Sequence, residues 1–236
     1  MKKHDLKIAV VNFSGNVGKS TIARHLLSPR MPEAVVVAVE TINADSASVV
    51  TVKGGDFGRL QEDLMLEDAA IIDVGASNIE QFMSLMRMYR GSQDDFDLFI
   101  VPCVPVPKQQ KDTVECVNAL AELGVPAKKI VVVFNMVEPN TNIAEIFEPV
   151  LRFAEAEGKC QVDVRAAIYK NEVFTRLRGS TETIQSLLDD PTDFKAEIKK
   201  ATAPEERLAF AERLSTQRLA QGVQENLNSV FEVVVP

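Results

Sequence analysis

The 236-residue sequence predicts a doubly wound α/β fold, in which helices flank a mostly parallel β-sheet. Short apolar runs rich in β-branched residues alternate with segments of helical spacing, an order typical of parallel sheets. The runs are nearly continuous, which indicates strands that are covered on both faces. In such folds a ligand binds at the carboxyl ends of the strands.

The strands and helices of this fold can be placed in order along the chain. The predicted strands are Ile8–Val11, Ala34–Val39, Ala70–Val74, Leu98–Val101, Ile130–Phe134 and Val162–Ile168. Between them, residues 79–90, 114–123 and 143–153 carry apolar side chains every three or four positions, which predicts helices with one buried face. Gly124 and Pro126 supply a stop signal for the second of these helices.

The region past residue 178 differs in pattern. Its charges alternate in sign, and it contains no strong strand before Val230–Val235. Helices are predicted there over residues 182–188, 194–200 and 204–220. The chain therefore divides into a main α/β domain, residues 1–178, and a helical C-terminal extension, residues 179–236, that packs on or projects from the same domain.

Composition limits the classes of function. The net charge of −8 makes the chain a poor candidate for a broad contact with a nucleic-acid backbone. No apolar stretch approaches the roughly 18 residues that span a bilayer. The charged residues 1–5 lead directly into a strand, unlike a secretory signal. We therefore expect a cytoplasmic protein.

The most informative stretch is Ser-Gly-Asn-Val-Gly-Lys-Ser-Thr at residues 14–21, between the first strand and a helix that begins near Thr21. Backbone N–H groups in such a turn can converge on phosphate oxygens at the helix N-terminus. Lys19 can reach the β- and γ-phosphates, and the Ser20 hydroxyl can ligate Mg²⁺. The predicted nucleoside-triphosphate site consists of Ser14, Gly15, Asn16, Val17, Gly18, Lys19, Ser20 and Thr21. The alternative is a chance surface loop.

The stretch departs from the general pattern G-x-x-x-x-G-K-[ST], because the first glycine falls on Phe13. It resembles instead the deviant Walker A motif of the ParA/MinD family, K-G-G-x-G-K-[ST]-[ST]. Gly15 and residues 18–21 fit that motif, whereas Ser14 replaces the signature lysine and Asn16 replaces a glycine. The ParA/MinD resemblance covers about residues 7–170. Within it, the run from residue 12 to residue 27 is most similar to the StbB-type plasmid stability proteins.

Asp73 is the second candidate of the site. It ends an apolar strand and can reach Mg²⁺ opposite the phosphate loop, directly or through a water. The resemblance places it in the switch II region, followed by the turn Val74-Gly75-Ala76. The alternative is a strand-end carboxylate that caps the next turn.

The resemblance implies two more site positions. An acidic residue of switch I is expected after the second strand, and either Glu40 or Asp45 can fill it. Asn135, after the fifth strand, is expected to hydrogen-bond the adenine edge, since an amide both donates and accepts. The alternatives are a solvated loop acid and a turn-forming asparagine. The expected catalytic residues are thus Lys19, Glu40 and Asp73, and the expected metal ligands are Ser20 and Asp73.

The resemblance implies ATP or ADP and Mg²⁺ as ligands, a nucleotide-dependent homodimer and a DNA-binding partner protein of a plasmid stability operon. It leaves direct DNA binding and a role in conjugative transfer open. The family's signature lysine reaches the phosphate of the other subunit, and Ser14 has neither the length nor the charge to do so. Lys53 or Lys108 can supply a replacement cation, so hydrolysis is left open.

Three functions are compatible with these residues. The first is a ParA/MinD-like ATP-binding switch with slow ATPase activity, acting in plasmid stability, segregation or positioning. The second is a nucleotide-sensing adaptor with little or no hydrolysis, which the missing signature lysine favours. A small-molecule kinase is the least favoured, because the arginines that its lid requires are few.

Overall fold

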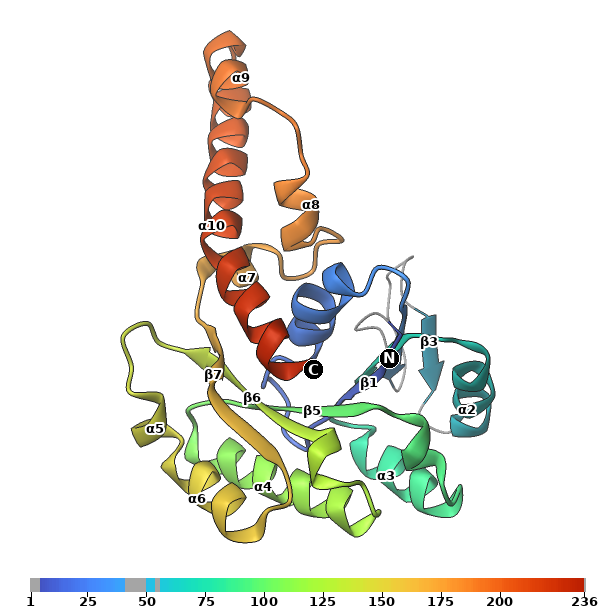
Figure 1. Cartoon of the computed structure of the whole chain (residues 1–236). Coiled ribbons are helices and arrows are strands. Elements are labelled where there is room, and N and C mark those ends of the chain that lie inside the picture. The colour runs from blue at the N-terminus through green and yellow to red at the C-terminus, as the bar shows by residue number, and fades with distance from the viewer. Residues whose placement is uncertain (1–4, 41–49, 54–55, 236) are drawn as a thin grey trace.

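The computed structural model describes residues 5–40, 50–53 and 56–235, and within them a seven-stranded sheet forms the centre of the molecule (Figure 1). All neighbouring strands are parallel, in the order β3-β2-β4-β1-β5-β6-β7. The strands are β1 (Lys7–Val10), β2 (Val35–Glu40), β3 (Val50–Lys53), β4 (Ala70–Val74), β5 (Leu98–Cys103), β6 (Ile130–Val137) and β7 (Gln161–Tyr169). The predicted doubly wound parallel fold is therefore confirmed.

Helices cover both faces of this sheet, and each face has its own apolar core. Below the sheet in Figure 1 lie α2 (Phe57–Leu66), α3 (Ile79–Met88), α4 (Pro107–Glu122), α5 (Ile143–Ile146) and α6 (Glu148–Glu157). Above it lie the helix that follows β1, then α7 (Glu172–Arg176), α8 (Ile184–Leu188) and α10 (Pro204–Val234). Alternate residues of β1 pack into opposite cores: Ala9 packs below the sheet, and Ile8 and Val10 pack above it.

The helix after β1 is irregular. It begins as α1 (Lys19–Thr21), continues as a π-helical segment at Ile22–Leu27 and ends in a 3₁₀ turn at Ser28–Arg30. The buried side chains Ile22 and Leu26 fix this helix to the upper face of the sheet. Packing therefore holds the N-terminal end of the helix at the edge where the parallel strands end.

One sequence-based expectation about the elements was wrong, and one strand was missed. The apolar run Val230–Val235 is not a strand, because helix α10 continues through it to Val234. Its buried positions, Val223, Leu227, Val230 and Val234, recur every three or four residues, and this packing overrides the β-propensity of valine. The edge strand β3 was not expected, because four residues are too few to show a period.

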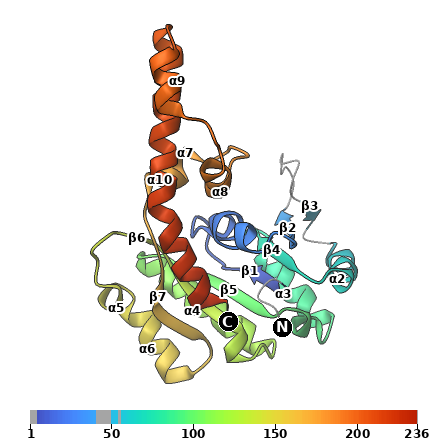
Figure 2. The ribbon, with the colours of Figure 1, turned by 45° about the horizontal axis from the view of Figure 1, so that its top comes forward.

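Helix α10 is 31 residues long and has two different halves. The half from Ala220 onward is buried against the upper core. The half from residue 204 to residue 219 projects from the body, with α9 (Phe194–Lys200) alongside it (Figures 1 and 2). Phe194 and Phe210 join the two helices, with ring centroids 6.4 Å apart. We call α9 and residues 204–219 the arm.

The two halves of α10 should respond differently to truncation. Leu227 is buried, whereas Leu208 on the arm is 60% exposed. We expect Leu227→Ala to lower the free energy of unfolding by about 2–5 kcal/mol, since it removes buried contacts and leaves a cavity. Leu208→Ala is the matched control and should change it by less than about 0.5 kcal/mol. Urea denaturation measures both, and equal effects would contradict this assignment of the core.

Candidate functional site

The phosphate loop, residues 11–18, connects β1 to α1. Asn16 and Gly18 have positive φ angles, 58° and 87°. A Cβ atom on Gly18 would lie 2.1 Å from Asn135 Nδ2, so only glycine fits at this position. This close contact fixes the loop against the end of β6 and leaves its backbone N–H groups at the start of α1, the arrangement that binds phosphate.

Lys19 is buried inside this loop. Its ammonium Nζ donates hydrogen bonds to the carbonyl oxygens of Ser14, at 2.9 Å, and Asn12, at 3.3 Å. Burial lowers the pKa of Lys19, and the negative charge of Asp73 partly offsets that effect. The loop therefore holds a desolvated cation at its centre, ready to exchange carbonyl partners for phosphate oxygens.

Ser14 is tied to α4 instead of extending outward. Its hydroxyl donates to Asp112 Oδ2 at 2.5 Å, and its backbone N–H donates to Asn12 Oδ1 at 2.7 Å. The side chain is only 8% exposed. The position of the family's signature lysine is thus occupied by a short, neutral group whose hydroxyl is already bound to a carboxylate.

Further residues of α4 and β5 support the loop, and the sequence analysis missed them. Gln109 Nε2 donates to Gly15 O at 2.9 Å. Asn12 Nδ2 donates to Thr113 Oγ1 at 2.9 Å and to Pro102 O at 2.8 Å. The order of strands explains these contacts, because β5 lies next to β1 and α4 follows β5. The polar first turns of α4 were the available signal, but their target depends on the strand order.

Asp73 lies across from the phosphate loop because β4 pairs with β1, where Asp73 is in register with Val10. Burial raises the pKa of this carboxyl group. A hydrogen bond with Ser20 and the charge of Lys19 act against the rise, and the charge of Glu40 adds to it. Atom Oδ1 is buried and has no hydrogen-bond partner in the described part of the chain.

These features test whether the residues fit a magnesium ion. A buried carboxylate oxygen without a partner, beside a serine hydroxyl and a phosphate loop, is the hard oxygen set that Mg²⁺ prefers. Ser20 and Asp73 therefore fit the ion. A bound Mg²⁺ ion would also remove the free-energy cost of leaving the buried Oδ1 atom of Asp73 without a partner.

Glu40 ends β2, and the structure brings it close to Asp73. Strands β2 and β4 pair with Ala38 opposite Asp73, and Glu40 is half-buried beyond that pair. The turn after β4 is tied to the end of β2, because the Gly75 N–H donates to Val39 O at 3.0 Å. The other switch I candidate, Asp45, lies outside the described residues.

Asn135 is buried, and its amide contacts the phosphate loop. Nδ2 donates to Val17 O at 2.8 Å. A β-bulge turns the side chain in this direction: the pairing of β6 with β7 slips between Phe134 and Val137, and Met136 has a φ of 56°. The sequence gives no sign of the bulge. The contact with adenine stays a prediction. The bond to Val17 uses one N–H of the Asn135 amide, so the amide oxygen and the second N–H are the groups that this contact would use.

A pocket of about 540 Å³ lies beside the phosphate loop, a size typical of small-molecule sites. Its walls come from α1 and the helix that follows it, from the ends of β6 and β7, and from α7. The lining residues are Ser20, Thr21, Arg24, His25, Asn135, Met136, Tyr169, Lys170, Asn171, Glu172, Phe174, Thr175, Leu177, Arg178 and Gly179. Residues 169–179 were missed, although they follow the carboxyl end of a parallel strand, where ligands bind.

The comparisons with known proteins bear on the fold. No protein-family model matches the chain, and no curated protein matches its sequence at a significant level. Among solved structures, MinD of Aquifex aeolicus has 12% identity and a TM-score of 0.51, and the match covers 89% of this chain and 97% of that one. The MinC:MinD complex of Aquifex aeolicus gives 11% identity, a TM-score of 0.52 and coverage of 89% and 96%.

A structure of pnob8 ParA has 12% identity and a TM-score of 0.50, and the match covers 94% of this chain and 98% of that one. The fold is that of the ParA/MinD P-loop ATPases. In this fold the described chain brings Lys19, Ser20, Asp73 and Glu40 to the edge of the sheet where the parallel strands end. No helix in the described residues has both the length and the apolar character to cross a membrane.

Removing the charge of Asp73 should stabilise the metal-free protein. The folded state holds the carboxyl proton more tightly than the unfolded chain does. The contribution of Asp73 to stability therefore falls as the pH rises from its ordinary pKa through the raised one. At pH 7 we expect Asp73→Asn to raise the free energy of unfolding by about 1 kcal/mol in the presence of EDTA. Asp68→Asn, an exposed carboxyl group, is the control; a loss of stability specific to Asp73→Asn would contradict the assignment.

Because of His25, we expect the stability of the folded protein to fall at acidic pH. Burial, together with the charge of Arg24, lowers the pKa of His25 to about 4. Because the unfolded chain binds this proton near pH 6.5, stability is lost as the pH falls from about 6.5 towards 4. When the pH is lowered from 7.5 to 5.0, we expect the protonation of His25 to reduce the free energy of unfolding by about 2 kcal/mol.

The variant His25→Asn tests this pH dependence, because its amide oxygen can replace Nδ1 as the acceptor of the Ile184 N–H, 3.5 Å away. Urea denaturation at the two pH values should show a smaller loss in the variant than in the wild type. An identical loss in both proteins would show that His25 is not the titrating group.

Proposed function

We propose that the chain is an ATP-binding switch protein of the ParA/MinD type with slow ATPase activity. The observation that carries the proposal is the buried Asp73 carboxylate. It hydrogen-bonds to Ser20 at the start of α1, and its Oδ1 atom has no hydrogen-bond partner in the described part of the chain. A phosphate loop, a buried lysine and a pocket of nucleoside size adjoin it. ATP with Mg²⁺ satisfies all of these groups together.

Each residue has a role in binding. The backbone N–H groups of the phosphate loop and α1 donate hydrogen bonds to the phosphate oxygens, and Lys19 exchanges the Ser14 and Asn12 carbonyl oxygens for phosphate oxygens. Mg²⁺ held by Ser20 and Asp73 supplies positive charge that neutralises the phosphates. The nucleoside enters the pocket at the ends of β6 and β7, where Asn135 offers its amide oxygen to the base.

Hydrolysis requires a positioned water, and Glu40 is an acid near enough to Asp73 for its charge to raise the pKa of that carboxyl group. A glutamate in place of the family's aspartate shifts the carboxylate by about one C–C bond, which is enough to alter the rate. The absence of a charge at Ser14 removes a cation from the transition state, and such cations accelerate GTPases by about 10³–10⁵-fold. We therefore propose a slow ATPase.

The proposal extends to partners. The StbB-type run at residues 12–27 supports a role in plasmid stability, segregation or positioning, with a nucleotide-dependent homodimer and a DNA-binding partner protein of the same operon. These functions act in the cytoplasm, where ATP and plasmid DNA are found. The competing proposal is a nucleotide-sensing adaptor that hydrolyses little ATP, and the hydrogen bond between Ser14 and Asp112 favours it, because that bond occupies the position of the signature lysine.

ATP turnover and assembly should both depend on Lys19. We expect Lys19→Ala to reduce ATP turnover by on the order of 100-fold, because it removes the buried cation of the phosphate loop. The control is Lys199→Ala, an exposed lysine of the arm. Sedimentation with ATP·Mg²⁺, with ADP and without nucleotide reports assembly. Wild-type dimers that form with ATP alone support the switch.

Other outcomes separate the two proposals. Nucleotide binding without turnover and without a change in assembly would replace the switch with the adaptor. Equal and measurable turnover in wild type, Lys19→Ala and Lys199→Ala would refute the nucleotide site itself.

A further inference from the structure

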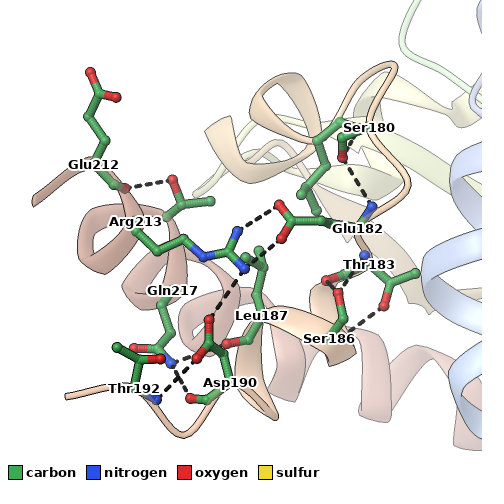
Figure 3. Close-up of polar contacts among 12 residues, drawn as sticks. Ser180, Glu182, Thr183, Ser186, Leu187, Asp190, Thr192, Glu212, Arg213 and Gln217 are labelled. Atoms are coloured by element: carbon green, nitrogen blue, oxygen red, sulfur yellow. Dashed lines mark hydrogen bonds and ion pairs between the residues drawn. The ribbon is translucent and has the colours of Figure 1, made fainter. Parts of the chain in front are cut away.

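One segment of the chain touches both the nucleotide pocket and the arm. Residues 178–190, which we call the linking segment, run from the pocket wall through α8 towards α9 (Figure 1). Arg178 and Gly179 line the pocket at its beginning. Its polar contacts with α10 are drawn in Figure 3. The linking segment is therefore part of both structures.

The helix after the phosphate loop holds the linking segment from the pocket side. Arg24 lines the pocket, and its Nη2 donates to the carbonyl oxygen of Glu182 at 2.9 Å. The next residue, His25, accepts from the Ile184 N–H at 3.5 Å and contacts the ring of Phe174, 5.9 Å away between centroids. A ligand in the pocket thus meets residues that also position the linking segment.

Arg213 of α10 holds the same segment from the arm side. Its guanidinium makes a two-point contact with the Glu182 carboxylate, at 2.6 Å and 2.5 Å, and lies 3.4 Å from Asp190 Oδ2. Figure 3 shows Arg213 between these two acids. Gln217, one turn further along α10, donates to the carbonyl oxygens of Leu187 and Asp190. Contacts at Glu182 and at the end of the segment, Leu187 and Asp190, therefore fix it to α10.

The linking segment has its own local order between these anchors. Thr183 and Ser186 form a capping box at the start of α8, with hydrogen bonds of 3.0 Å and 2.9 Å. Such a cap lets a helix of five residues keep its position. The cap begins at Thr183, so α8 follows directly after Glu182 in the chain.

The side chains of this network are partly exposed, 29% for Arg213, 38% for Glu182 and 21% for Asp190. Exposed ion pairs add little stability by themselves, so their main effect is geometric. Glu182 is the shared residue: its carbonyl binds Arg24 of the pocket, and its carboxylate binds Arg213 of the arm. One residue thus connects two sites that are far apart in the sequence.

Resting on the proposed function, we infer that the linking segment couples nucleotide binding to the arm. Nucleotide in the pocket packs against Arg24, Arg178 and Gly179, and this stabilises the position of the segment in which Glu182 binds Arg213. The arm held by Arg213 in turn pre-forms the pocket wall. Because linkage is reciprocal, loosening the arm weakens nucleotide binding by the same factor as nucleotide tightens the arm. The arm is thereby the part of the molecule that reports the nucleotide state to a partner.

The test is nucleotide affinity in Arg213→Ala, measured by calorimetric titration with ATP·Mg²⁺ on the full chain. We expect an increase in Kd on the order of 5-fold, at the low end of couplings between sites. The effect is partial because a second contact, from Arg176 to Ser215 and Thr216 of α10, stays intact. Arg218→Ala, an exposed arginine on the same helix, is the matched control and should leave Kd unchanged.

Two further measurements keep a folding defect separate from the coupling. Glu182→Gln removes the charge that binds Arg213 and leaves the backbone carbonyl that binds Arg24, so its Kd should rise like that of Arg213→Ala. Hydrogen exchange in the wild type should slow in α8 and in residues 204–219 when ATP·Mg²⁺ is added.

The coupling would be overturned if Arg213→Ala and Glu182→Gln bound ATP with wild-type affinity. It would also be overturned if ATP did not change hydrogen exchange in the arm. Neither result would contradict the ATP site. Absence of ATP binding by the wild type would overturn the proposed function, and the coupling with it. These results are distinguishable because the first requires measurable binding in every variant.

Discussion

Strand β1 pairs with β4 on one side and with β5 on the other, and this pairing fixes the whole candidate site. The phosphate loop leaves the end of β1, so the neighbours of β1 decide which other side chains reach it. Strand β4 brings Asp73, and β2 beyond it brings Glu40. On the opposite side β5 leads into α4, which supplies Gln109 and Asp112. The strand order therefore places Asp73 and Glu40 on one side of the loop, and Gln109 and Asp112, which hold the loop, on the other.

The charges of the site balance only in part without a ligand. Lys19 is buried among carbonyl oxygens, and Asp73 is buried with one oxygen unpartnered in the described chain. Burial shifts the pKa values of both groups towards their neutral forms. Burying these two ionisable groups lowers the stability of the fold, and the large apolar cores on both faces of the sheet compensate for that loss. A site under such strain gains most from a ligand that brings both anions and a cation.

The sequence was sufficient where a local signal existed. The phosphate loop, Lys19, Ser20 and Asp73 follow from a motif and a strand end, and six of the strands follow from apolar runs. The missed contacts are those that depend on packing over long distances. The hydrogen bond from Asn135 to Val17 joins residues 118 positions apart and depends on the β-bulge in β6. No sequence pattern near either residue predicts that bulge. The valines of the last turn of α10 were assigned to a strand for the same reason, since only the core shows which face they bury.

Ser14 connects the architecture to the proposed mechanism. A lysine at this position would extend from the loop, whereas Ser14 is held inward by Asp112, and that contact leaves the loop without an outward cation there. The proposed dimer would therefore lack a lysine that crosses from this position to the phosphate of a second subunit. The arm is the part of the described structure that projects furthest from the body, and Glu182 joins it to the pocket. The loop has no lysine at position 14, and the arm is linked to the pocket. Both features fit the proposal that the arm responds to bound nucleotide and that hydrolysis is slow.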